Sequence, residues 1–140
     1  MAGATTLYTP EVLALATGLA GFAWDEGLPL KGEARSKSCG STIGLGLGLD
    51  PAGRIDRVAL RAQACAIGQA AAAIFARAAH GRDARAIAEA DEAIAAWLSG
   101  AADLPDWPGL AAIAPARDYP ARHGAIRLAW QAARQLLPMD

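Results

Sequence analysis

The sequence predicts a single α+β domain over residues 1–140, in which helices cover a three-stranded antiparallel β-meander. Apolar and small residues alternate over 42–49, so leucine and isoleucine side chains share one face of a strand. Beyond residue 65, apolar side chains recur at helical spacing. Because consecutive short strands joined by turns pair antiparallel, the apolar face of this sheet needs helices to cover it.

The composition excludes several classes of protein. The 140 residues include 13 basic and 14 acidic side chains, for a net charge of -1, which gives no reason to expect binding to nucleic acid or to an anionic membrane. With 54% hydrophobic and 19% charged residues, the chain is not disordered. The apolar run 12–24 follows no basic residue and ends at Asp25, which fits neither a signal peptide nor a membrane span. We expect a cytoplasmic protein.

The first half of the chain predicts a helix followed by the three strands. Thr9 and Pro10 are typical of a helix N-terminus, and Gly18 of its end. A connecting loop is expected over 21–30. The expected strands are 33–38, 42–49 and 54–62, with a turn at 50–53.

The second half predicts three helices. Apolar side chains from Ile67 to Ala78 form a helical stripe, and Asp83 is placed to cap a second helix that ends before Gly100. A long loop is expected over 101–120, and a last helix over 121–137. Three tryptophans are expected in the core, Trp97, Trp107 and Trp130. The acidic pair Asp91 and Glu92 is interpreted as part of a solvated face.

The two cysteines are the main candidates for chemistry. Cys39 lies at the turn before the strand 42–49, and Cys65 lies where the third strand gives way to a helix. Unpaired N–H groups at a helix N-terminus favour thiolate, which is both a nucleophile and a soft-metal ligand. Adjacent strands of a meander can bring the two thiols together. Two cysteines are too few for a disulfide framework, and each has the alternative role of a small buried apolar residue.

Other motifs are less informative. His80 is interpreted as a surface residue at a helix end, whereas His123 opens the last helix and is a candidate ligand. The alternating glycines of 44–48 lie within a strand pattern and do not form a dinucleotide-binding turn.

In combination, these motifs resemble the iron–sulfur cluster scaffold family, which includes IscU, SufU and the N-terminal part of NifU. The resemblance covers nearly the whole chain, and several features point to the SufU branch. It rests on Leu7-Tyr8, Cys39-Gly40, the turn 50–53, the helix opening Cys65-Ala66-Ile67-Gly68-Gln69-Ala70, Gly81-Arg82, Pro120-Ala121-Arg122 and Leu128-Ala129-Trp130.

The resemblance implies a SufE/NifU-like architecture and a scaffold rather than a turnover enzyme. Members of the family gather three cysteines and an aspartate at one exposed end, where they hold a nascent iron–sulfur cluster or a zinc ion. Sulfur comes from a cysteine desulfurase, and the finished cluster passes to acceptor proteins. The implied partners are therefore a desulfurase and cluster acceptors, and the implied state is a monomer or a weak homo-oligomer.

Carried over residue by residue, the resemblance assigns Cys39 and Cys65 to the first two cysteines. The aspartate position is Ser41, and the position of the third cysteine is Ala125. His123 is two residues away and is the candidate third ligand, while Arg122 matches an arginine near the site in the SufU branch. This chain therefore departs from the family's ligand pattern at two positions. Zinc takes four ligands or three plus water, and a cluster takes four, mostly thiolates, so the departure leaves either site short of ligands.

Three hypotheses follow. The first is a divergent scaffold or sulfur-trafficking protein in which Cys39 and Cys65 hold a metal or cluster, or accept a persulfide. The second is a binding module that keeps the fold and docks to a desulfurase or an acceptor without carrying a cluster. The third is a redox switch in which Cys39 and Cys65 form a reversible disulfide.

Overall fold

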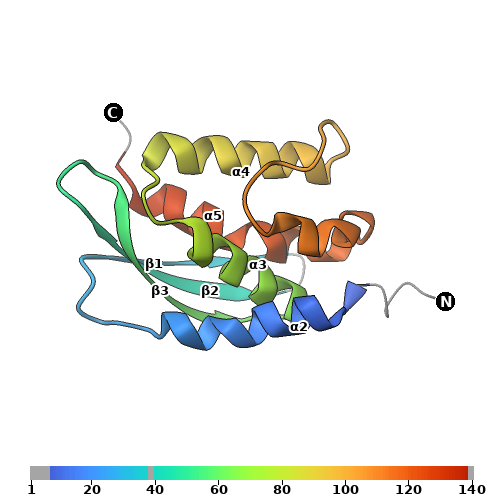
Figure 1. The fold of residues 1–140 in the computed structure, drawn as a ribbon, viewed down its shortest axis with the longest axis horizontal. Helices are drawn as coiled ribbons and strands as arrows, with labels where there is room; N and C mark the ends of the chain where they lie inside the picture. Colours follow the sequence, from blue (N-terminus) through green and yellow to red (C-terminus); the bar gives the residue numbers. More distant parts are fainter. Residues whose placement is uncertain (1–6, 38–39, 139–140) are drawn as a thin grey trace.

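The structure is a computed structural model and describes residues 7–37 and 40–138. Helices pack in layers on one face of a three-stranded sheet, with α3 and α5 next to the strands and α4 outside α5 (Figure 1). The predicted α+β meander is confirmed. None of the helices in these residues is long and apolar enough to cross a membrane.

The N-terminal helix α2 (Pro10–Thr17) begins as its capping sequence predicts. The Thr9 side chain accepts a hydrogen bond from the Val12 backbone N–H, and Pro10 occupies the first turn, where its missing N–H costs nothing. Val12 and Leu15 are buried against α3. A short 3-10 helix, η1 (Gly18–Phe22), continues the chain toward the sheet.

The sheet contains β1 (Leu30–Arg35), β2 (Thr42–Leu49) and β3 (Ile55–Gln63) in the order β1-β2-β3, with both pairs antiparallel. The predicted bounds of the second strand are reproduced. The turn between β2 and β3 is held by Asp50, whose Oδ1 accepts hydrogen bonds from the backbone N–H groups of Ala52 and Arg54.

The first strand differs from the expected range 33–38. It begins at Leu30, which pairs with Leu47, and it ends at Arg35, which pairs with Thr42. The Ser36 N–H then donates to the Ser41 carbonyl at 2.8 Å and closes the hairpin loop. The pairing with β2 therefore fixes this strand, because its own sequence lacks a strong apolar alternation.

The two faces of β2 have different surroundings. Ile43, Leu45 and Leu47 are fully buried and face the helices. The glycines between them face the other side, where a Cβ added at Gly46 would lie 3.1 Å from the Leu28 side chain. The connection before β1 thus crosses this glycine face closely.

Three α-helices and two 3-10 helices complete the fold: α3 (Ala66–Ala78), α4 (Ala84–Leu98), η2 (Leu110–Asp118), η3 (Pro120–Arg122) and α5 (His123–Leu136). The segment expected as a loop over 101–120 is therefore mostly 3-10 helix in its second half. Phe75, Trp107 and Trp130 pack together with ring centroids 5.4–5.9 Å apart, and all three predicted core tryptophans are buried.

The prediction that Asp91 belongs to a solvated face of α4 is wrong. Its side chain is 2% exposed rather than solvated, and it accepts hydrogen bonds from Arg127 and Arg134 of α5. Its neighbour Glu92 is exposed, as predicted. The two arginines compensate the buried carboxylate, which is why an acidic residue fits between the two helices.

Candidate functional site

The candidate site lies at one end of the sheet. Arg35, Thr42 and Gln63 are paired neighbours across the three strands at this end. The β1–β2 loop and the β3–α3 connection both leave from it, so the loop that contains position 39 and the residue Cys65 belong to the same end of the sheet. Cys39 itself lies outside the described residues.

Cys65 lies at the N-terminus of α3. Its backbone is extended, with φ -65° and ψ 170°, and its carbonyl accepts the first helical hydrogen bond from the Gln69 N–H at 2.9 Å. The thiol makes no capping hydrogen bond within the described structure, and the residue is partly exposed. Its side chain also packs against the hydrophobic core, so Cys65 lies at the edge of the core where α3 begins.

Gln69 supports the segment that leads to Cys65. Its side-chain Nε2 donates to the Ala64 carbonyl at 2.8 Å, which ties the β3–α3 connection to the first turn of α3. In the sequence, Gln69 stands out only as part of the motif that opens the helix. No local sequence pattern indicates that a glutamine four residues after the N-cap of a helix makes this contact.

Ala125 packs close to this helix N-terminus. A Cβ added at Gly68 would lie 3.2 Å from the Ala125 Cβ and 2.9 Å from the Ala64 Cβ. Gly68 is one turn along α3 from Cys65, so Ala125 also lies near the Cys65 end of α3. Its side chain is 1% exposed and offers no donor atom to a ligand.

Ser41 is the last residue of the hairpin loop before β2. It is 6% exposed, and its carbonyl accepts the Ser36 N–H that closes the loop. The structure thus places Ser41 at the same end of the sheet as Cys65 and Ala125.

Arg122 connects the start of α5 to the N-terminal segment. One of its guanidinium nitrogens, Nη2, donates to the Tyr8 hydroxyl at 3.0 Å, across a separation of 114 residues. The residue is only partly exposed. The role of Tyr8 was not predicted, because nothing in the local sequence indicates a contact over such a distance.

His123 lies on another side of α5. Its Nε2 is 2.7 Å from the Arg117 carbonyl oxygen, so Nε2 carries the proton and Nδ1 keeps a lone pair in the neutral ring. His123 and Ala125 are two residues apart, which corresponds to about 200° around a helix. The ring therefore contacts η2, whereas Ala125 contacts α3.

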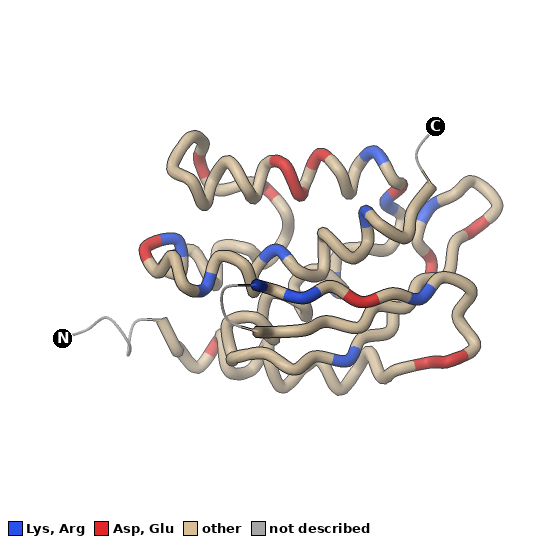
Figure 2. Tube along the Cα trace, turned by 180° about the vertical axis from the view of Figure 1, so that it is seen from behind, with Lys and Arg blue, Asp and Glu red and all other residues tan. Residues whose placement is uncertain are grey.

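Basic residues lie at this end of the molecule as well as elsewhere on its surface. Figure 2 shows blue segments beside the β1–β2 loop and at the start of α5, while the connection before β1 carries acidic residues at the far end. Arg35 ends β1, Lys37 follows it at the start of the loop, and Arg122 lies at the α5 N-terminus. Arg35, Lys37 and Arg122 therefore contribute positive charge at this end of the sheet.

Within the described ranges, no group of three or more His, Cys, Asp or Glu side chains is arranged to hold a metal ion. Cys39 lies outside these ranges. Of the predicted site residues, the structure brings Ser41 and Cys65 to one end of the sheet, with Ala125 beside them. It places His123 against η2.

Comparison with solved structures gives two strong matches over nearly the whole chain. A nitrogen-fixing NifU-like protein (N-terminal) from Brucella abortus has a TM-score of 0.85 and 26% identity, covering 95% of this chain and 93% of that one. A putative iron–sulfur cluster assembly scaffold protein for the SUF system from Fervidobacterium islandicum has a TM-score of 0.85 and 20% identity, covering 97% and 100%. A hypothetical protein matches at a TM-score of 0.70.

The chain has the fold of the NifU-like and SufU scaffold proteins. The resemblance found in the sequence is thereby confirmed. No protein-family model and no curated protein matches the sequence. The match to the NifU-like protein is therefore a match of three-dimensional structure, and the two sequences are only 26% identical.

Ser41 and Ala125 are the residues that the sequence resemblance assigns to two ligand positions of the scaffold family. Both side chains are buried, and both occupy the end of the sheet that carries Cys65. A buried hydroxyl group is a poor metal ligand, and a methyl group is none.

Proposed function

We propose that this protein works in iron–sulfur cluster assembly or sulfur trafficking, and that it holds a metal ion or a nascent cluster through Cys39 and Cys65. The observation that carries the proposal is the 0.85 TM-score to two scaffold proteins over at least 95% of the chain. The partly exposed Cys65 at the N-terminus of α3 supports it. We place the protein in the cytoplasm, with a cysteine desulfurase and cluster acceptors as partners.

The donor atoms of this chain suit an incomplete coordination shell. Two thiolates provide half of a tetrahedral zinc or iron site, and neither the Ser41 hydroxyl nor the Ala125 methyl group replaces the missing ligands well. A metal or cluster held by Cys39 and Cys65 therefore needs donors from His123, a second molecule or a small thiol. Such a site binds its cargo weakly and releases it readily.

We include His123 as the third donor of the proposal. Metal-binding histidines commonly donate their other ring N–H to a carbonyl, and His123 makes this kind of bond to Arg117. Coordination would then use Nδ1. Because the ring contacts η2, this role also requires the start of α5 to turn toward Cys65.

Sulfur transfer needs only one accessible thiolate. The Cys65 sulfur attacks the outer sulfur of a desulfurase persulfide, so that the donor's S–S bond breaks and a persulfide forms on Cys65. The donor cysteine leaves as a thiolate, and no external oxidant or reductant is needed. Arg122 and the other basic residues at this end favour these anions.

The first test measures bound zinc and iron after anaerobic incubation and desalting. We expect Cys39→Ser and Cys65→Ser to lose bound metal and His123→Asn to weaken binding, whereas His80→Asn matches the wild-type protein. The double variant Ser41→Asp/Ala125→Cys restores the family's donor set and should bind metal more tightly. Equal metal retention in wild-type and both cysteine variants would contradict the proposal.

The alternative is a module that docks to a desulfurase or an acceptor without carrying a cluster. The buried Ser41 and Ala125 favour it, because both family ligands at these positions are absent. A pull-down with the desulfurase separates the two functions. Wild-type protein that binds the desulfurase but retains no metal, together with an equally active Cys39→Ala/Cys65→Ala variant, would establish the module.

A further inference from the structure

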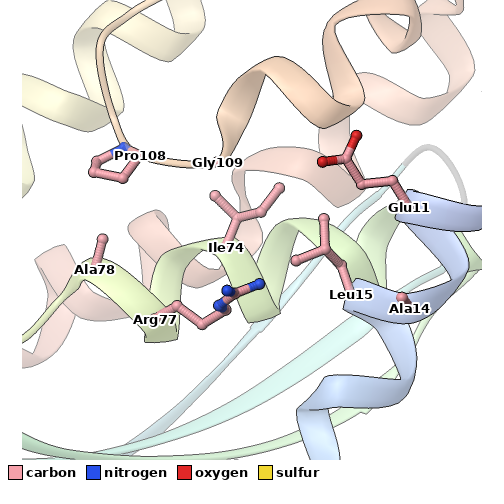
Figure 3. A pocket seen from close by; sticks show the side chains of 8 residues that line it. All are labelled: Glu11, Ala14, Leu15, Ile74, Arg77, Ala78, Pro108 and Gly109. Atoms are coloured by element: carbon pink, nitrogen blue, oxygen red, sulfur yellow. The ribbon is translucent and has the colours of Figure 1, made fainter.

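A groove on the helical side of the molecule is separate from the cysteine end. Figure 3 shows it between α2, α3 and the chain that leads into η2. Its volume is about 410 Å³. Volumes of this size are typical of small-molecule sites. Its lining residues are Glu11, Ala14, Leu15, Ile74, Arg77, Ala78, Pro108 and Gly109.

The groove combines an apolar floor with one charge of each sign. Leu15 and Ile74 line the groove with apolar side chains from α2 and α3, and Glu11 and Arg77 extend from the same two helices (Figure 3). Within the described residues, neither charged side chain has a hydrogen bond or an ion pair with another residue. Both charges are thus available to a bound molecule.

The length of the groove limits what it can hold. The lining residues span positions 11–15 on α2 and 74–78 on α3, and four residues of helix rise about 6 Å. An extended peptide of two or three residues covers about 7–10 Å. A peptide of this size is somewhat longer than the helical segments, so its two ends extend beyond them. A small zwitterion with an apolar centre fits the volume and the two charges.

We propose that this groove binds a short peptide with free termini and an apolar side chain. The peptide's ammonium group lies against Glu11, its carboxylate lies against Arg77, and its side chain packs on Leu15 and Ile74. The groove uses the C-terminal half of α3, whereas Cys65 precedes the first turn of this helix, so binding here does not depend on the cluster chemistry.

The test titrates the full-length protein with the tripeptide Ala-Leu-Ala and follows backbone amide signals by NMR. We expect saturable shifts at Ile74 and Gly109. Acetylation of the peptide N-terminus or amidation of its C-terminus removes one charge, and either should weaken binding about tenfold because a charge-assisted hydrogen bond is lost.

Variants assign each charge. Glu11→Gln should bind the free and acetylated peptides equally, and Arg77→Gln should do the same for the free and amidated peptides. Glu89→Gln and Arg85→Gln, two exposed residues of α4, are the matched controls and should keep the wild-type preference.

Three results would overturn the proposal. They are the absence of saturable shifts, equal binding of free and doubly blocked peptides by the wild-type protein, and binding only of a longer peptide whose termini are both blocked. Because none of these readouts involves metal or sulfur, the groove can fail the test while the proposed function stands.

Discussion

Gly68 sets how closely α5 approaches the start of α3. A Cβ at this position would come within 2.9 Å of the Ala64 Cβ and 3.2 Å of the Ala125 Cβ, both on short side chains that cannot rotate away. Only a shift of backbone would make room. The close contact between these helices therefore depends on the missing side chain, and it positions Ala125 near the candidate site.

Substitution of Gly68 tests this contact. Alanine normally stabilises a helix by about 1 kcal/mol over glycine, but overpacking a core costs about 1–3 kcal/mol. We expect Gly68→Ala to lower the free energy of unfolding by about 1 kcal/mol in urea titrations. Gly18→Ala, where nothing lies within 4 Å, should leave it unchanged or raise it. A Gly68→Ala protein at least as stable as wild type would refute the contact.

Cys65 should react with alkylating reagents in the folded protein. It is partly exposed, and its thiol is not used in the helix cap. In the Cys39→Ser variant, we expect iodoacetamide to modify Cys65 under native conditions, as measured by mass spectrometry over time. Modification that occurs only after unfolding in urea would show that Cys65 is an inaccessible core residue.

Glu26 gives a pH-dependent signal at a single residue. A hydrogen bond from the Trp24 indole N–H at 2.6 Å and another from Lys31 hold the pKa of Glu26 below the usual carboxyl value of 4.5. Folding therefore favours the ionised form of Glu26. The stability that these two hydrogen bonds contribute is fully present above the pKa of Glu26 in the unfolded chain, and it is lost as the pH falls through the lower pKa of the folded protein. NMR titration of the Trp24 indole signal should give a midpoint below 4.5; a midpoint at or above this value would exclude the interaction.

At the scale of elements, α4 is attached to the molecule chiefly through α5. Buried apolar residues of α4 supply most of this contact, and Asp91 adds an ion pair with Arg127 at 3.1 Å and another with Arg134 at 3.2 Å. The two guanidinium groups are about a third exposed, and they remain hydrated if the carboxylate is removed.

The Asp91→Asn substitution measures this contribution. Removing one partner of a fully buried pair costs about 3–5 kcal/mol, and the partial exposure of the arginines reduces the expected loss to about 1–3 kcal/mol. Glu92→Gln is the matched control, because Glu92 is 70% exposed and its 3.4 Å pair with Arg134 should contribute less than about 1 kcal/mol. Equal stability of the two variants would show that burial of Asp91 has no energetic role.

Local patterns predicted most of the elements but not every contact between them. The alternation over 42–49 and the capping residues Thr9 and Asp83 act within a few residues, and their strand and helices are confirmed. The range of β1 was wrong because pairing with β2 decides it. The burial of Asp91 was missed for a similar reason, since its arginine partners lie 36 and 43 residues away.

At the scale of the whole molecule, the candidate site combines segments from the entire chain. Tyr8, the β1–β2 loop, Cys65 and the start of α5 come together only in the folded protein. Of the residues that the resemblance singled out, Ser41, Cys65 and Ala125 lie at this end, whereas His123 packs against η2 and Cys39 lies outside the described residues. The resemblance could not predict that Ser41 and Ala125 would be buried, because burial depends on how the hairpin loop and α5 pack.

Anaerobic reconstitution with iron and sulfide tests the central claim most directly. After desalting, we expect the wild-type protein to retain iron, sulfide and visible cluster absorption, and the Cys39→Ser/Cys65→Ser variant to retain none of them while circular dichroism shows an unchanged fold. If the wild-type protein retains no iron or sulfide, or if the double variant retains as much as the wild type, the claim that Cys39 and Cys65 hold a cluster is wrong.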